Sequence, residues 1–176
     1  MLRKTNIYLF TVAALALVIL AGCTMNGGGV VSFQAVETGL GAGTPTDASI
    51  AISLNCNDNK NAWRSNINVV DNTNNAHINA HVKQWMPVSE FGAATTCAEA
   101  AAVAEAEGFS IAFGIMTSQG QENGQAVVAV SKPGVVPECG GLQYIQVQAI
   151  ENTPDSLPGG LYFAAGCLDR GKINFN

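Results

Sequence analysis

The chain has 176 residues, of which 48% are hydrophobic, and its 13 acidic residues outnumber its 8 basic ones to give a net charge of −5. This length is enough for one domain with a hydrophobic core. The basic residues form no cluster beyond the N-terminal segment, which argues against a positive patch for nucleic acid or for anionic lipid head groups.

Residues 1–22 have the pattern of a secretory signal peptide. Arg3 and Lys4 form a short positive segment, and residues 7–21 that follow are almost wholly apolar. The apolar run is short for a membrane span, and small residues stand at its end. We therefore expect residues 1–22 to be removed from the mature protein.

The segment ends in Leu20-Ala21-Gly22-Cys23. This tetrapeptide resembles the lipobox of bacterial lipoprotein precursors, a likeness confined to the N-terminal segment. It implies cleavage before Cys23 and attachment of acyl chains such as palmitate to that cysteine. Two or more acyl chains hold a protein stably on a bilayer, at about 0.8 kcal/mol per buried CH₂. An ordinary signal peptide, or an uncleaved N-terminal helix, with Cys23 incidental is the alternative.

The lipobox resemblance also implies a location. The mature chain would sit in the bacterial cell envelope, bound to the lipid bilayer through acylated Cys23. In Gram-negative members of the family, Asp after the cysteine favours the inner membrane, whereas this chain has Thr24. The resemblance thus favours the periplasmic face of the outer membrane. Loss of Arg3 and Lys4 would leave six basic residues against 13 acidic ones, a net charge of −7.

Residues 23–47 are predicted to be the lipidated N-terminus and a glycine-rich tether. Gly27-Gly28-Gly29 opens this stretch, although residues 30–36 have the pattern of a short strand. The glycines do not match a dinucleotide-binding fingerprint. A flexible linker of this kind would lift residues 48–176, the predicted single globular domain, off the membrane.

Short β-strands dominate the predicted domain. Apolar residues alternate along residues 48–54, and residues 63–71 and 76–85 form a plausible hairpin around a polar turn. Further strands are predicted in the later part of the chain, over residues 109–116, 125–131, 142–150 and 161–167, with a short last one near Ile173 and Phe175.

One helix is predicted, over about residues 96–107. Thr96 is a good N-cap, Glu99 completes a capping box, and Gly108 is a fitting stop. Its alanine-rich body would lie close on a sheet. We expect the next strand to be central and packed against the helix, with large apolar residues at every second position: Phe109, Ile111, Phe113 and Ile115.

The predicted fold class is α+β: an antiparallel sheet of about 7–8 short strands with the one helix packed on it. The alternative is a β-sandwich with one helix. Acylation of Cys23 would leave four cysteines, namely Cys56, Cys97, Cys139 and Cys167. An even number in an exported protein predicts two disulfides, and four buried free thiols are the alternative. The preferred pairing is Cys56–Cys97 with Cys139–Cys167, because the second pair flanks a predicted hairpin.

His77 and His81 are the only histidines and are weak candidates for metal ligands. On a strand their Cα atoms would lie about 13 Å apart, too far to share one zinc ion without a bulge. The chain contains no P-loop, zincin motif or nucleophile elbow. We therefore expect no metal, no cofactor and no assigned catalytic residue.

The function predicted from these features is a non-catalytic accessory role, or binding to another envelope protein, by a membrane-anchored lipoprotein. A peptidoglycan-binding or glycan-binding module is one alternative, with Trp63, Trp85, Tyr144 and Tyr162 as candidate aromatic contacts. A cell-wall hydrolase is the other. Nucleic acid is not an expected partner, because the mature chain is acidic.

Overall fold

The computed structural model describes residues 24–57, 59–87 and 96–175. The predicted signal peptide and Cys23 lie outside the described residues. Among the residues that are described, no helix has the length and hydropathy needed to cross a bilayer.

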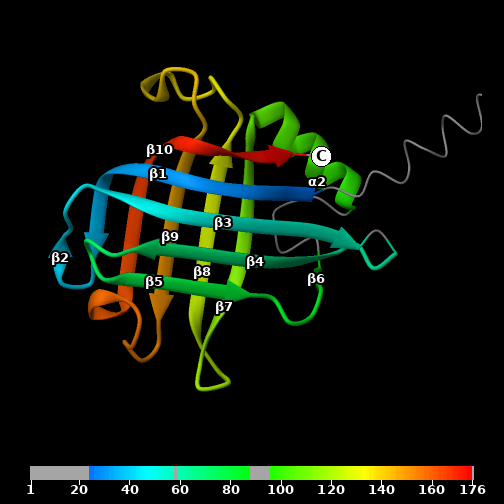
Figure 1. The fold of residues 1–176 in the computed structure, drawn as a ribbon. Coiled ribbons are helices and arrows are strands. Elements are labelled where there is room, and N and C mark those ends of the chain that lie inside the picture. Colours follow the sequence, from blue (N-terminus) through cyan, green and yellow to red (C-terminus); the bar gives the residue numbers. More distant parts are fainter. Residues whose placement is uncertain (1–23, 58, 88–95, 176) are drawn as a thin grey trace, which may run out of the picture.

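Eight long strands make up most of the described chain (Figure 1). They are β1 (Thr24–Thr38), β3 (Thr46–Asn57), β4 (Ala62–Asp71), β5 (Ala76–His81), β7 (Phe109–Ser118), β8 (Gln121–Ser131), β9 (Tyr144–Glu151) and β10 (Leu161–Phe175). The short strands are β2 (Gly41–Ala42) and β6 (Met86–Pro87), and the helices are α2 (Cys97–Glu107) and the 3-10 turns η2 (Pro137–Cys139) and η3 (Pro158–Gly160).

The eight strands close into an antiparallel barrel. Each pairs with the next long strand along the chain, and β10 then pairs with β1, from Met25 opposite Phe175 to Thr38 opposite Tyr162. In Figure 1, β1, β3, β4 and β5 run across the front of β7, β8 and β9 at a steep angle. Both the predicted open α+β sheet and the β-sandwich alternative are therefore wrong. The alternation of apolar and polar residues shows only which side chains share a face of a strand. Closure of the sheet into a barrel depends on the pairing of β1 with β10, which are far apart in the sequence.

Strand β1 occupies the segment in which a tether was expected. Glycine fits at these positions because backbone atoms of the neighbouring strands β3 and β10 lie too close to leave room for a side chain. A Cβ added to Gly28 would meet the carbonyl oxygen of Ile50 at 2.3 Å, and one added to Gly29 would meet that of Arg170 at 1.8 Å. Residue 24 is already paired with Asn55 of β3, so the barrel begins one residue after Cys23.

Side chains fill the barrel interior, as an eight-stranded barrel allows. Large residues such as Phe33, Ile67 and Ile78 point inward from β1, β4 and β5. Small and β-branched residues face them from the other half of the barrel, among them Ala112, Ala126, Val128, Val147, Ala149 and Ala164. The core thus lies inside the closed sheet and not between a sheet and the helix.

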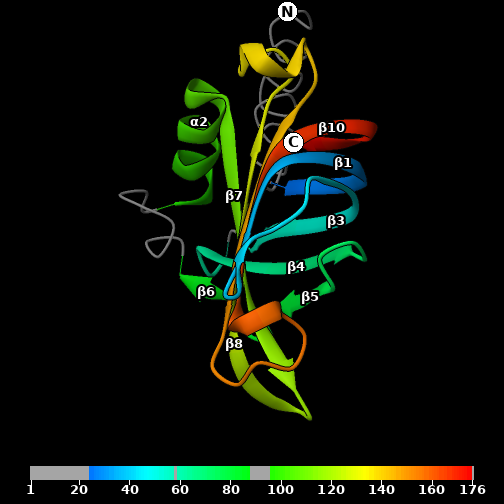
Figure 2. The ribbon, with the colours of Figure 1, turned by 90° about the vertical axis from the view of Figure 1, so that its left-hand side faces the viewer.

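Helix α2 lies outside the barrel beside β7 (Figure 2). Its predicted ends are confirmed: Thr96 is the N-cap of a capping box with Glu99, and Gly108 closes the helix at φ 70°. The two predicted disulfides are present. Cys56 is bonded to Cys97 at a Cα–Cα distance of 6.2 Å, and Cys139 to Cys167 at 5.4 Å.

Candidate functional site

The outer surface of the barrel has two faces of different chemistry. We call the outer side of β7, β8, β9 and residues 161–165 the apolar face. The cationic face is the outer side of residues 170–174 and of β1, β3, β4 and β5. The cationic face is toward the viewer in Figure 1, and Figure 2 shows β7 and β8 on the other side of the barrel.

The apolar face is built from three rows of residues that are paired across neighbouring strands. The middle row is Phe113, Val127, Gln148 and Phe163, and the rows beside it are Ile111, Ala129, Gln146 and Ala165, and Ile115, Gln125, Ile150 and Leu161. None of these twelve positions carries a charge. Two of the largest side chains are notably open to solvent, Ile111 at 50% and Ile150 at 42% exposure.

The alternation expected along β7 is present, and the structure shows which of its two sides faces the barrel interior. Ala112, Gly114 and Met116 point into the barrel, while Ile111, Phe113 and their neighbours of the same parity point outward. The interior has little room at this point, because a Cβ added to Gly114 would lie 2.9 Å from the Cβ of Ala80. The small residues of β7 therefore face inward, and the large ones remain on the outside.

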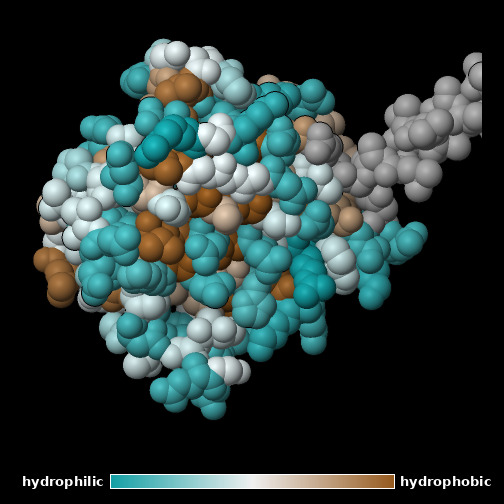
Figure 3. Space-filling model, in the orientation of Figure 1, coloured by the Kyte–Doolittle hydropathy of each residue, from teal (hydrophilic) through white to brown (hydrophobic). Residues whose placement is uncertain are grey.

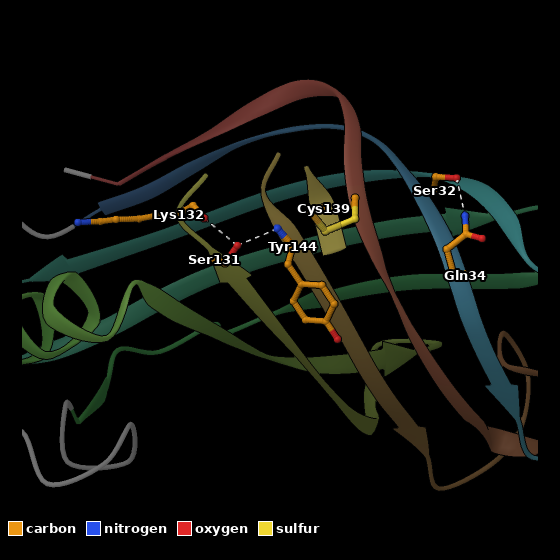
Figure 4. The surroundings of a disulfide bond; sticks show 7 residues. Ser32, Gln34, Ser131, Lys132, Cys139 and Tyr144 are labelled. Carbon is orange, nitrogen blue, oxygen red and sulfur yellow. Dashed lines mark hydrogen bonds between the residues drawn. A yellow bond between two sulfur atoms is a disulfide. The ribbon is translucent and has the colours of Figure 1, made fainter. Parts of the chain in front are cut away.

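One end of the apolar face is held by the second disulfide (Figure 4). The Ser131 hydroxyl accepts a hydrogen bond from the backbone nitrogen of Tyr144 at 2.8 Å and donates one to the carbonyl oxygen of Lys132 at 2.9 Å. The Cys139–Cys167 bond ties η2 to β10 in the same region. These contacts fix the loop between β8 and β9 over the end of the sheet.

The other end of the face is closed by the loop between β9 and β10. Buried Glu151 accepts hydrogen bonds from the backbone nitrogens of Asp155, Ser156 and Leu157. The Ser118 hydroxyl donates to Asp155, and this bond is the main reason why the pKa of Asp155 lies below its ordinary value. The loop is thus a fixed rim of the surface.

The four aromatic residues proposed as glycan contacts are not gathered in one place. Trp63 and Tyr162 are buried in the core, at 5% and 0% exposure, whereas Trp85 and Tyr144 are half-buried. Burial and the adjacent Asp71 carboxylate raise the pKa of Tyr162. Within the three rows of the apolar face the aromatic residues are Phe113 and Phe163, and Tyr144 lies beyond these rows on the outer side of β9.

His77 and His81 lie on the outer side of β5, with Asn79 between them. Their neighbours on β4 are Val70 and Asn66, neither of which is a metal ligand of the kind that zinc prefers. Within the part of the chain that the structure describes, no three His, Cys, Asp or Glu residues come together in a group that could hold a metal ion.

The strongest feature of the surface is therefore the uncharged apolar face, held by a disulfide at one end and by the Glu151 loop at the other. Comparison with protein-family models, with curated proteins and with solved structures found no match to this chain.

Proposed function

We propose that this protein is a lipid-anchored, non-catalytic component of the bacterial cell envelope that binds another protein through its apolar face. The lipobox-like Leu20-Ala21-Gly22-Cys23 supports the anchor. The observation that supports binding is the exposure of Ile111 and Ile150 within three rows of uncharged residues.

The composition of the face favours a protein as the partner. The centre of a protein–protein interface is poor in charged residues and rich in aromatic ones, and the row from Phe113 to Phe163 has both properties. Gln125, Gln146 and Gln148 supply neutral hydrogen-bonding groups between the apolar side chains. The matching partner surface is apolar and uncharged, with backbone or amide groups that satisfy these three glutamines.

Anchoring and binding are tested separately. A labelled fatty acid should be incorporated into the full-length protein and not into Cys23→Ser. A photoreactive amino acid at Gln148, between the two phenylalanines, should form an adduct with one envelope protein in living cells. The same probe at Asn68, on the outer side of β4, is the matched position on the opposite face and should not form that adduct.

Two double variants then identify the surface that is responsible. Ile111→Glu with Ile150→Glu should abolish the Gln148 adduct, because each unpaired buried carboxylate at a contact costs at least about 2 kcal/mol, or about 30-fold in affinity. Asn68→Glu with Asn79→Glu adds the same charge to the other face and should leave the adduct intact. A dimer of this chain as the only adduct, or equal loss in both variants, contradicts the proposal. The unmodified protein could instead bind purified sacculi, with only the Ile111→Glu, Ile150→Glu variant losing this binding. That result would show that the apolar face binds peptidoglycan and not a protein.

A further inference from the structure

The barrel gathers basic side chains that are far apart in the sequence. Arg64 on β4, Lys83 just after β5, and Arg170 and Lys172 on β10 are all exposed on the cationic face. None of the four has an ion pair among the described residues. Lys132, in contrast, lies elsewhere and pairs with Glu105 at 3.2 Å. Four of the six basic residues expected in the mature chain are therefore unpaired on one surface, although the sequence, in which they form no cluster, argued against such a surface.

No Asp, Glu, Lys or Arg occupies the outer positions between these four side chains. They are occupied by small, polar or histidine side chains and by two valines, namely Thr24, Asn26, Gly28, Val30, Ser49, Ala51, Ser53, Asn55, Asn66, Asn68, Val70, His77, Asn79, His81 and Asn174. The described carboxylates of this face are Asp47, Asp169 and Glu37, which stand toward the end of the face that is remote from residue 24, with Asp169 next to Arg170 in the sequence. Figure 3, which views this face, shows hydrophilic side chains around an area in its middle where apolar residues also reach the surface.

This face begins at the point where the lipid would be attached. Thr24 pairs with Asn55, and Asn55 pairs with Arg64. The backbone nitrogen of Val82 donates to Ser65, which continues the row to Lys83. At about 4.8 Å between strands, Arg64 and Lys83 lie about 10 and 14 Å from Thr24. Lys172, opposite Gly28, lies about 13 Å from Thr24 at roughly 3.3 Å per residue.

We propose that the cationic face lies flat on the anionic phospholipid head groups of the bilayer that holds the anchor, so that the apolar face points away from the membrane. This rests on the proposed lipidation of Cys23. Because β1 starts at residue 24, no linker separates the acyl chains from the barrel, and all four cations stay near the surface. Acyl chains and basic side chains then act together, as in other two-signal membrane anchors.

The net negative charge of the chain does not oppose this orientation, because its described acids lie mainly elsewhere. Glu105 and Glu107 are at the C-terminal end of α2, outside the barrel beside β7, while Glu99 stands in the first turn of α2, near the Cys56–Cys97 bond. Glu122 is the second residue of β8, and Glu138 is in η2. Only charges within about one Debye length of the bilayer interact with it strongly. An anionic bilayer would therefore repel these acids when they come close to it, and the orientation with the cationic face on the membrane is favoured.

Lysine footprinting of the purified, lipidated protein in vesicles tests the orientation. A membrane-impermeant amine reagent would be applied to vesicles of zwitterionic phosphatidylcholine alone and to vesicles that also contain phosphatidylglycerol. We expect Lys83 and Lys172 to react about fivefold more slowly in the anionic vesicles, the factor that corresponds to attraction of one basic side chain to such a surface. Lys132 is the internal control and should react equally in both.

Two further arms separate the possible outcomes. High salt should remove the protection, and Arg64→Gln with Arg170→Gln should weaken it, while the protein stays attached to both kinds of vesicle. Equal reactivity of Lys83 and Lys172 in the two kinds of vesicle overturns the orientation. Release of the protein from phosphatidylcholine vesicles shows instead that the anchor itself is absent. Absence of the Gln148 adduct, with the footprint as expected, would contradict the proposed protein binding and leave the orientation on the membrane unaffected.

Discussion

The phenol of Tyr162 on β10 donates a hydrogen bond to Oδ2 of Asp71, at the end of β4, over 2.8 Å and 91 residues of sequence. Both residues are fully buried. Asp71 also accepts hydrogen bonds from the backbone and side-chain nitrogens of Asn74, at 3.0 and 2.7 Å. The bond therefore connects the turn between β4 and β5 to the opposite wall of the barrel, and it satisfies a carboxylate that water does not reach.

Tyr162→Phe should destabilise the barrel because it removes one partner of the buried Asp71 carboxylate. We expect the free energy of unfolding in urea to fall by about 1–3 kcal/mol. Tyr144→Phe is the matched control: the Tyr144 ring is half-buried on the outer surface, and we expect a change within about 0.5 kcal/mol. Equal effects of the two substitutions would show that the bond to Asp71 contributes nothing.

The same bond predicts a loss of stability in alkali. Because the pKa of Tyr162 is raised in the folded protein, its contribution is fully present below the ordinary value of 10.0 and is lost as pH rises above it. The stability difference between the natural protein and Tyr162→Phe should therefore shrink between about pH 10 and 11. Urea titrations at pH 8 and at several values above pH 10 would measure it. A difference that grows with pH would contradict the assignment.

Helix α2 should depend on the disulfide between Cys56 and Cys97. Cys97 is the one buried residue of this 11-residue helix, and helices of that length are marginal on their own. Replacing both cysteines with serine should speed hydrogen exchange of residues 97–107 strongly, while β3, β4 and β8 stay protected. The Cys139→Ser, Cys167→Ser variant is the control and should leave α2 unchanged. Slow exchange of α2 in both variants would mean that packing alone holds it.

Gly29→Ala should prevent normal closure of the barrel. The added Cβ would lie 1.8 Å from the carbonyl oxygen of Arg170, a backbone atom that cannot move aside, so the cost should exceed the about 1–3 kcal/mol of ordinary overpacking. Gly120→Ala, in a turn with nothing within 4 Å of the new atom, should cost only about 1–2 kcal/mol from its positive φ. Thermal unfolding would compare them. Similar midpoints for the two variants would contradict the tight approach of β1 and β10.

Local patterns predicted several elements of this fold well. The capping residues Thr96, Glu99 and Gly108 predicted both ends of the helix, because caps depend on neighbouring backbone groups alone. Alternation also predicted the buried face of β3, from Ala48 to Leu54. In both cases the information lies within a few residues.

Closure and the two outer faces could not be predicted in this way. Gly27-Gly28-Gly29 has the composition of a linker, and only the approach of β3 and β10 shows that these glycines belong in a strand. The pattern of β7 shows two faces but not which one is inside, and the small residues of the barrel interior decide that. Arg64 and Lys172 are brought to one surface by strand register, which no local feature of the sequence reveals.

The pairing of β1 with β10 also sets the order in which the barrel can be completed. Strand β10 is synthesised after every other described strand, and until it arrives both β1 and β9 present open edges to other chains. A chain crossing a membrane in extended form would spend that interval with its hydrophobic interior accessible. A chain that stops before residue 161 would therefore keep the two strand edges and the hydrophobic interior accessible, and would be open to proteolysis.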